Sequence, residues 1–275
     1  MTKNTYNYNL KKFNIQKRVA VITGGAGFLG KKHVEAIAEI GGTTVIFDKK
    51  IRKANIIARE IHKKYNTESL AFKVDVTDEK QIYKVSNLIK KRLGSIDILI
   101  NNVATNPIVG NKKNKLFQRL EKFKLSDWNA DINVGLTSAF LCSKVIGLIM
   151  ANQKKGVIIN ISSDLGIIAP DQRIYKNNDL VKPISYSVVK HGLIGLTKYL
   201  STYWADKGVR SNALCPGGVL NNQNPEFVKK ISELIPIKRM ANEDEYKSAI
   251  QFLSSDASSY MNGSSLIIDG GRTAW

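Results

Sequence analysis

The sequence has few cysteines and lacks a long uncharged apolar run. Cys142 and Cys215 are the only cysteines in 275 residues. They lack metal-ligand spacing, so we expect free thiols, no disulfide framework and no metal site. No stretch of about 18 apolar residues is free of charge, and Met1 to Lys17 has no signal-peptide core. These absences lead us to expect a soluble, cytoplasmic protein with no membrane partner.

Acidic residues are also scarce, because 23 Asp and Glu face 42 Lys and Arg and leave a net charge of +19. The basic residues are spread along the chain, which favours a solvated surface over a nucleic-acid interface, so we expect no nucleic-acid partner. One basic segment, Lys112 to Lys124, follows a predicted strand and could overhang a site at the strand's end.

From Arg18 onward, short apolar runs alternate with amphipathic stretches, which predicts an α/β fold with a parallel sheet. Residues 1–17 read as a polar N-terminal extension and residues 18–275 as a single domain. We expect a doubly wound Rossmann sheet with strand order 3-2-1-4-5-6-7 and ligands at the carboxyl ends of its strands. The predicted strands are 19–22, 44–47, 70–74, 96–100, 156–161, 210–214 and 265–268. The predicted helices are 29–40, 53–65, 79–93, 128–152, 185–205 and 243–253.

The first predicted strand runs into the glycine-rich segment Thr23-Gly-Gly-Ala-Gly-Phe-Leu-Gly30. Glycines there permit a tight turn and let the backbone approach a pyrophosphate at a helix N-terminus. Asp48 ends the second predicted strand, where a carboxylate binds ribose hydroxyls and repels a 2′-phosphate. This pattern predicts dinucleotide binding and favours NAD(H), although Lys49 and Lys50 leave NADP(H) open. A turn or helix-cap acid is the alternative role for Asp48.

Tyr186 and Lys190 are four residues apart on one predicted helix, so their side chains share a face. A neighbouring ammonium favours the phenolate, which would allow Tyr186 to exchange protons near neutral pH. This spacing is common on amphipathic helices and does not by itself distinguish a catalytic pair from a surface pair. The other motifs must decide between the two.

The ordered motifs of residues 18–271 resemble those of the short-chain dehydrogenase/reductase family. The resemblance rests on the glycine-rich loop, Asp75-Val76, Asn101-Asn102-Val103-Ala104, Asn133, Asn160-Ile-Ser-Ser163, Tyr186, Lys190 and Pro216-Gly217. The cofactor-binding residues that it implies are Thr23, Gly24, Gly27, Phe28, Leu29, Gly30, Asp48, Asp75, Val76, Asn102, Val103, Ala104, Tyr186, Lys190, Pro216, Gly217 and Val219.

The resemblance also implies a catalytic set of Asn133, Ser163, Tyr186 and Lys190. Tyr186 would exchange the proton of a carbonyl or alcohol oxygen as hydride moves to or from the nicotinamide. Lys190 would lower the pKa of Tyr186 and bind the nicotinamide ribose, and Ser163 would stabilise charge on the reacting oxygen. Asn133 would hold a water that connects Lys190 to solvent. Taken singly, Ser163 and Asn133 could instead be ordinary structural polar residues.

Two features depart from the compact form of the family. The position of Gly27 resembles the extended branch, but residues 191–275 leave little room for that branch's larger carboxyl-terminal substrate domain. Val103 and Ala104 replace the usual Ala-Gly, which could alter the approach of the cofactor slightly.

Residues 164–185 form an enlarged loop between Ser163 and Tyr186, and such a loop is a natural substrate wall. Asp171, Gln172 and Arg173 are candidate substrate contacts, with Arg173 suited to phosphate or carboxylate; a merely solvated loop is the alternative. The segments 164–175 and 185–192 resemble reductases of bacterial surface-glycan and flagellin-glycosylation pathways, including those that serve nonulosonic acids. We therefore expect a small polar, sugar-type substrate in carbohydrate metabolism.

Two other functions are open at this stage. A 3-oxoacyl-[acyl-carrier-protein] reductase is the nearest, since a basic surface could dock an acidic carrier. A non-catalytic dinucleotide sensor is the alternative from another class, although such sensors tend to lose the tyrosine or lysine. The resemblance also implies a homo-oligomer, a tetramer or dimer, formed through the helices predicted at 128–152 and 185–205.

Overall fold

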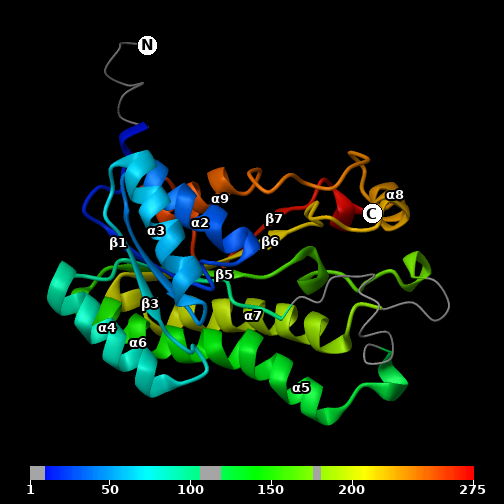
Figure 1. The fold of residues 1–275 in the computed structure, drawn as a ribbon, viewed down its shortest axis with the longest axis horizontal. Coiled ribbons are helices and arrows are strands. Elements are labelled where there is room, and N and C mark those ends of the chain that lie inside the picture. The colour runs from blue at the N-terminus through cyan, green and yellow to red at the C-terminus, as the bar shows by residue number, and fades with distance from the viewer. Residues whose placement is uncertain (1–9, 106–118, 176–180) are drawn as a thin grey trace.

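Seven parallel strands form one continuous sheet in the computed structural model, which describes residues 10–105, 119–175 and 181–275 (Figure 1). Their spatial order is β3-β2-β1-β4-β5-β6-β7, so the predicted single-domain Rossmann fold and strand order are confirmed. The strands are β1 (Val19–Thr23), β2 (Thr43–Asp48), β3 (Ser69–Lys73), β4 (Ile98–Asn101), β5 (Gly156–Ile161), β6 (Val209–Pro216) and β7 (Ser265–Ile268).

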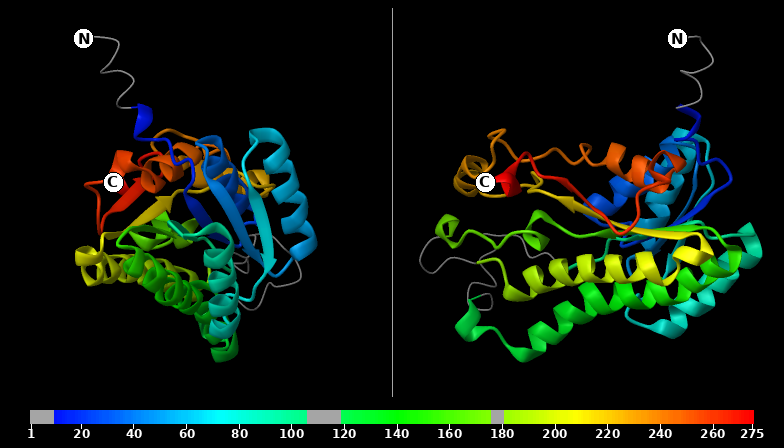
Figure 2. Two further views of the ribbon diagram at one scale, coloured as in Figure 1. Left: turned by 90° about the vertical axis from the view of Figure 1, so that its left-hand side faces the viewer. Right: turned by 180° about the vertical axis from the view of Figure 1, so that it is seen from behind.

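Helices cover both faces of the sheet, as the three ribbon views show (Figures 1 and 2). One face packs against α2 (Phe28–Glu39), α3 (Ile51–Tyr65) and α9 (Lys247–Ser254). The other face packs against α4 (Glu79–Leu93), α6 (Ser138–Gln153) and α7 (Ile184–Tyr203). The sheet is therefore the middle layer of three.

The central strands are apolar at successive positions because both of their faces are buried. In β1, Ala20 and Ile22 join the core beneath α2, whereas Val19 and Val21 join the core on the opposite side. A strand with one solvated face would instead alternate apolar and polar residues. The continuous apolar runs in the sequence are thus explained by the helices that bury both faces of the sheet.

The predicted helix 128–152 is divided in the structure. It comprises α5 (Leu125–Ile132), a π-helical segment (Asn133–Thr137) and α6, without an intervening loop. Among the described residues, the stretch Leu125–Gln153 has a window apolar enough to cross a membrane by length and composition, but 61% of that window is buried inside the protein. It therefore has the burial of a core helix.

Two parts of the fold differ from the sequence-based expectation. Helix α8 (Pro225–Glu233) was not predicted, although Asn224 caps it by accepting a hydrogen bond from the Glu226 amide at 2.8 Å. Within the segment predicted as a polar extension, Ile15 is fully buried in the core that also holds α2. This part of the extension therefore contributes to the packing of the domain.

Candidate active site

The glycine-rich loop leaves the carboxyl end of β1 and turns directly into α2. Gly24 has φ +63°, a left-handed conformation that favours glycine. A Cβ on Gly30 would lie 2.1 Å from the carbonyl oxygen of Gly24, so the first turn of α2 approaches the loop too closely for any side chain. Phe28 and Leu29 complete that first turn. In dinucleotide-binding turns, glycines permit the tight turn, the approach of the backbone to the pyrophosphate and the close packing of helix on strand. The loop has the shape that these requirements predict.

Asp48 lies at the end of β2, beside this loop. Its carboxylate accepts hydrogen bonds from the amide of Ala26 at 3.0 Å and from the amide of Lys50 at 2.8 Å. The neighbouring Lys49 forms an ion pair of 2.8 Å with Asp75. The acidic group therefore faces the loop, while the nearest basic group is held by a second carboxylate.

Asp75 and Val76 follow β3 on the same edge of the sheet. The Asp75 carboxylate also accepts from the Thr77 hydroxyl at 2.6 Å. Burial tends to raise the pKa of Asp75, but the hydrogen bonds from Lys49 and Thr77 outweigh it and lower that pKa. Val76 is buried. Both residues thus stand where the sequence placed them, and their contact with an adenine ring stays a prediction.

The segment after β4 braces the loop from its other side. The Asn102 side-chain amide donates to the carbonyls of Thr23 at 3.0 Å and Gly24 at 3.2 Å. A Cβ on Gly24 would lie 2.9 Å from a methyl group of Val103, so Val103 packs directly against the turn. Ala104 follows within the described residues. The Val103 amide also donates to the Thr23 hydroxyl, across 80 residues of the chain. These contacts hold the shape of the glycine-rich loop.

Ser163, Tyr186 and Lys190 come together at the end of β5. The Lys190 ammonium donates to the carbonyl of Ile161 at 2.7 Å and lies 5.5 Å from the centre of the Tyr186 ring. Ser162 binds the backbone of α7 by donating its hydroxyl to the carbonyl of Lys190 at 2.7 Å. These bonds hold the serine segment and α7 in one arrangement.

Burial shifts the pKa values of both proton-transfer groups. It raises the pKa of Tyr186 to about 12, against the opposite effect of a hydrogen bond with Ser163. It lowers the pKa of Lys190 to about 7, and the positive charge of Lys182 acts in the same direction. Because a buried site penalises the charged form of each group, the neutral phenol and a readily deprotonated ammonium are favoured here. The pKa of Tyr186 is thus raised in this structure, contrary to the prediction that Lys190 lowers it.

Asn133 is the first residue of the π-helical segment, and its carbonyl accepts from the amide of Ser138. The π segment packs tightly on α7, because a Cβ on Gly135 would lie 2.6 Å from a methyl group of Val189. Short π segments are frequent at functional sites. The predicted water held by Asn133 stays a prediction.

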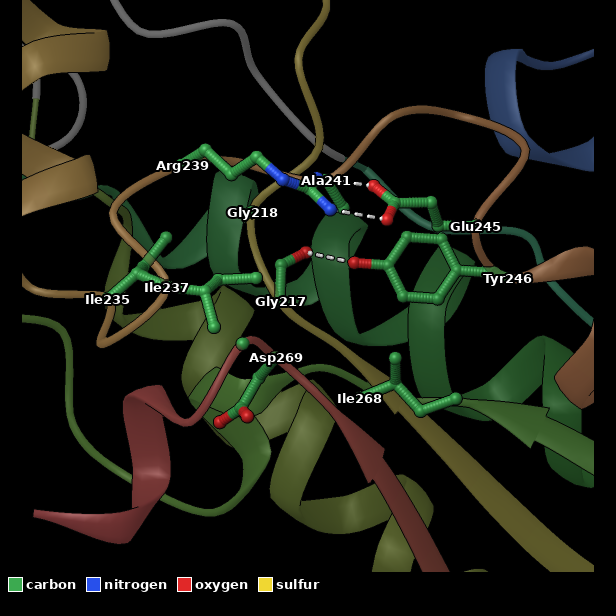
Figure 3. Close-up of a pocket in the computed structure, with 11 residues that line it drawn as sticks. Gly217, Gly218, Ile235, Ile237, Arg239, Ala241, Glu245, Tyr246, Ile268 and Asp269 are labelled. Atoms are coloured by element: carbon green, nitrogen blue, oxygen red, sulfur yellow. Dashed lines mark hydrogen bonds and ion pairs between the residues drawn. The ribbon is translucent and has the colours of Figure 1, made fainter.

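Pro216 ends β6, and Gly217 and Val219 follow it at the same edge. A Cβ on Gly217 would lie 2.8 Å from the Cα of Asp269, and the Tyr246 hydroxyl donates to the Gly217 carbonyl at 3.3 Å (Figure 3). Val219 forms a parallel bridge with Ala241. A cavity of about 60 Å³ borders Gly217, but ligand pockets span about 300–1,000 Å³. This cavity is therefore too small to hold a cofactor or a substrate.

In the enlarged loop, Asp171 and Arg173 bind each other. Asp171 caps a short 3-10 turn (Gln172–Ile174) by accepting from the Arg173 amide at 2.9 Å, and it pairs with the Arg173 guanidinium at 2.7 Å. The Tyr175 ring lies 6.1 Å from the Phe227 ring of α8. The loop is thus supported by the unpredicted helix, and the substrate contacts of Asp171, Gln172 and Arg173 stay predictions.

Parts of two predicted segments lie outside the described residues. The basic segment Lys112 to Lys124 is described only from Arg119 onward. In the enlarged loop at 164–185, residues 176–180 are outside the described residues.

Comparisons with known proteins agree with this geometry. Residues 25–273 match the profile of a family described as Enoyl-(Acyl carrier protein) reductase. The chain is 31% identical over 264 residues to the 3-oxoacyl-[acyl-carrier-protein] reductase FabG of Aquifex aeolicus, covering 94% of this chain and 99% of the relative. It is 31% identical over 268 residues to an NAD-dependent glycerol dehydrogenase of Listeria innocua, covering 96% of each. A gluconate 5-dehydrogenase from Burkholderia cenocepacia, solved with NADP and tartrate, superposes with a TM-score of 0.84 at 27% identity, covering 97% of this chain and 99% of that one.

The chain belongs to the short-chain dehydrogenase/reductase family. The resemblance inferred from the motifs is therefore confirmed at the level of the family. This short-chain dehydrogenase/reductase is an enzyme that acts on CH–OH and C=O groups of a small-molecule substrate, with a nicotinamide dinucleotide as cofactor.

The described residues of this short-chain dehydrogenase/reductase fit such a cofactor. Gly27 precedes α2 and has no side chain to cap the helix, so the free amides of the first turn can bind phosphate oxygens. The absence of Cβ atoms at Gly24, Gly27 and Gly30 lets the loop pack closely on the start of α2, which brings these amides to the carboxyl end of β1. Asp48 stands beside the loop. Bound there, the nicotinamide would supply or accept the hydride.

Sequence reasoning missed three side chains of this dehydrogenase/reductase that lie at the site. The Lys182 ammonium is 3.9 Å from the centre of the Tyr186 ring, nearer than that of Lys190. Asp164 and Arg272 form a buried ion pair beside Ser163. Lys182 lies within the enlarged loop at 164–185, whereas no pattern links Asp164 to a residue 108 positions away.

Proposed function

We propose that this enzyme prefers NAD(H) and interconverts a secondary alcohol and a carbonyl on a small polyol or sugar-type substrate. The observation that carries the reaction is the arrangement at the end of β5. There the Lys190 ammonium is fixed by a hydrogen bond to the Ile161 carbonyl, and Tyr186 is hydrogen-bonded to Ser163. The proposed NAD(H) preference follows from Asp48, because its carboxylate faces the loop and would repel a 2′-phosphate.

In the proposed mechanism, Tyr186 donates its phenolic proton to the substrate oxygen in the reducing direction and accepts it in reverse. Lys190 stabilises the phenolate through its positive charge, and its pKa of about 7 suits proton exchange near neutrality. Ser163 donates a hydrogen bond to the reacting oxygen as negative charge develops. Asn133 holds a water that returns protons from solvent.

The position of Lys182 supports the proposal that the substrate is polar. Its ammonium lies over the Tyr186 ring, where burial lowers its pKa to about 8. A cation next to the proton donor favours a substrate that carries hydroxyl, carboxylate or phosphate groups. The glycerol dehydrogenase and the gluconate 5-dehydrogenase among the similar proteins act on such compounds, as their names state. A sugar of surface-glycan biosynthesis is the narrower proposal, supported by the likeness of segments 164–175 and 185–192.

A 3-oxoacyl-[acyl-carrier-protein] reductase is the second candidate, because the Aquifex relative has that name and the net charge of +19 suits an acidic carrier. A non-catalytic sensor is less well supported, since Tyr186 and Lys190 are both in place.

Measuring turnover tests these alternatives. Purified enzyme is assayed at 340 nm with NAD⁺ and NADP⁺ on glycerol, tetritols, hexitols and gluconate, and with NADH and NADPH on ketoses and acetoacetyl thioesters. We expect activity with NAD(H) on the polyols or sugars. Activity confined to thioesters with NADPH would support the second candidate, and tight NADH binding without any turnover would support the sensor.

We also propose a cytoplasmic homo-oligomer, a dimer or tetramer. Exposed apolar side chains lie on the outer sides of α6 and α7, namely Phe140, Leu148, Tyr199 and Tyr203. Burial of such residues drives association. Light scattering of the purified protein gives its mass directly, and a monomer at micromolar concentration would contradict this proposal.

A further inference from the structure

A buried ion pair adjoins the proposed catalytic serine. A carboxylate oxygen of Asp164 accepts from the Arg272 guanidinium at 2.9 Å, and the side chains are only 4% and 5% exposed. Buried ion pairs add little net stability, because the loss of hydration offsets much of their attraction. The position of this pair beside Ser163 therefore points to a role in the site.

The other Asp164 oxygen holds Ser163. The Ser163 hydroxyl donates to it at 2.7 Å, and the amide of Leu165 donates to the same oxygen at 2.8 Å. A serine hydroxyl carries a single hydrogen, so this bond holds the Ser163 side chain in place while no reacting oxygen is present. When a reacting oxygen arrives, the hydroxyl exchanges this bond for one to that oxygen, and Asp164 keeps its bonds to Leu165 and Arg272.

This arrangement places a carboxylate close to the oxygen on which negative charge develops during hydride transfer. An uncompensated charge a few ångströms from that oxygen would slow the step by a factor of roughly 100 in a partly buried site. Arg272 offsets the charge of Asp164, because its guanidinium binds the oxygen that faces away from the serine bond.

We propose that Arg272 is a positioning residue, which lets Asp164 orient Ser163 without the carboxylate charge opposing the reaction. The inference rests on the proposed dehydrogenase function. Arg272 acts through Asp164 and Ser163.

The C-terminal segment is built to hold Arg272 in place. Asp269 accepts from the amides of Gly271 at 2.9 Å and Thr273 at 2.7 Å, which closes a tight turn around Arg272. Gly271 has φ +89°, a conformation that suits glycine. The Trp275 indole donates to the Leu234 carbonyl at 3.2 Å. The end of the chain is thereby fixed against the active site.

A double-mutant cycle tests the proposal, using the polyol or sugar that the wild-type enzyme oxidises fastest. Arg272→Met removes the cation that is hydrogen-bonded to Asp164 and leaves only the more distant charge of Lys182. We therefore expect kcat to fall about 100-fold, while the Kd for NADH, from its fluorescence, changes less than about threefold. Adding Asp164→Asn keeps an oxygen for Ser163 but removes the charge, so the double variant should regain at least about tenfold in kcat. A double variant no faster than Arg272→Met, at similar Tm, would overturn the proposal.

Arg272→Lys keeps the positive charge. It is the second test of the proposal, in case Arg272→Met does not fold. We expect it to retain kcat within about tenfold of wild type; a folded Arg272→Lys as slow as Arg272→Met also overturns the proposal. Arg92→Met, which removes a guanidinium from the exposed pair with Glu68, is the control and should leave kcat unchanged. Failure of the underlying function has a different signature, because Tyr186→Phe would then retain full activity.

Discussion

The ammonium of Lys190 lies 2.7 Å from the carbonyl oxygen of Ile161, the last residue of β5. This bond joins the middle of α7 to the strand end that precedes Ser163. The proton donor, its cation and the serine are therefore set by the packing of one helix on one strand. Their geometry is part of the core of the fold, and a substrate is not needed to create it.

Removing the Tyr186 hydroxyl should abolish proton transfer while leaving the fold intact. We expect Tyr186→Phe to lower kcat by about 10³-fold and to change the Kd for NADH by less than about twofold. Steady-state kinetics and NADH fluorescence measure the two quantities. Tyr199→Phe, on the exposed part of the same helix, is the matched control and should keep wild-type kcat.

Replacing Asp48 should relax the choice of cofactor. Asp48→Asn keeps an oxygen that can accept from the Ala26 and Lys50 amides but loses the charge. A hydrogen bond to a charged group contributes about 1.5–3 kcal/mol, so KM for NADH should rise by about 10- to 100-fold and the NADPH/NADH ratio of kcat/KM should increase. Asp206→Asn, at an exposed acid paired with Lys207, should change neither. A wild-type preference for NADPH would contradict the assignment of Asp48.

The close approach of α2 to the glycine-rich loop predicts a large difference between two Gly→Ala substitutions. In Gly30→Ala, the new methyl would lie 2.1 Å from the Gly24 carbonyl oxygen, which should lower the free energy of unfolding by about 2–3 kcal/mol. In Gly195→Ala, no atom lies within 4 Å of the new methyl, so the variant should gain about 0.5–1 kcal/mol through helix propensity. Urea denaturation measures the free energy of unfolding of both variants. Equal values would show that the glycine-rich loop can move to accept the new methyl group.

The stability of the fold should depend on Glu35 at acidic pH. Burial by itself raises the pKa of Glu35, but hydrogen bonds from Lys64 and Tyr65 and the charge of Lys247 lower it to about 2 from 4.5. Because the folded-state pKa is depressed, this stabilisation is present above pH 4.5 and is lost as the pH falls toward 2. The carboxylate is only 10% exposed, and we expect a contribution of about 1–2 kcal/mol.

Unfolding of Glu35→Gln as a function of pH checks this expectation. The variant should be less stable than wild type at pH 6 and should approach it near pH 2–3. Glu60→Gln, which alters the exposed pair with Lys31, should follow the wild-type curve. A constant difference between Glu35→Gln and wild type at every pH would mean that the ionisation is not responsible.

The sequence predicted the strands closely, because a sheet buried on both faces leaves continuous apolar runs. The strand order followed from the alternation of strands and helices, which is typical of a doubly wound Rossmann sheet. The edges of those runs also placed Asp48, Ser163 and Pro216 at strand ends. Helix α8 was missed, although Asn224 and Pro225 are typical starting residues of a helix.

Contacts between distant parts of the chain could not be predicted. Asp164 and Arg272 meet only because β5 and β7 end at the same edge of the sheet, with β6 between them. No motif links these two residues, so only the folded chain reveals their contact. Lys182 is a different case, because it is only four residues before Tyr186. It precedes the start of α7 at Ile184, so helical spacing does not predict its position over the Tyr186 ring.

The π-helical segment at Asn133–Thr137 has a consequence for length changes in this region. Its backbone bonds span one residue more than those of an α-helix, as the Ser138–Asn133 bond shows. Deleting one residue here would let α5 and α6 merge into a regular α-helix without breaking it. Because the wider π turn takes up the extra residue, α5 would keep its orientation and its packing on α7, and the change would fall on the segment that begins at Asn133. A one-residue gap at this point should therefore preserve the fold but remove the widened turn at Asn133.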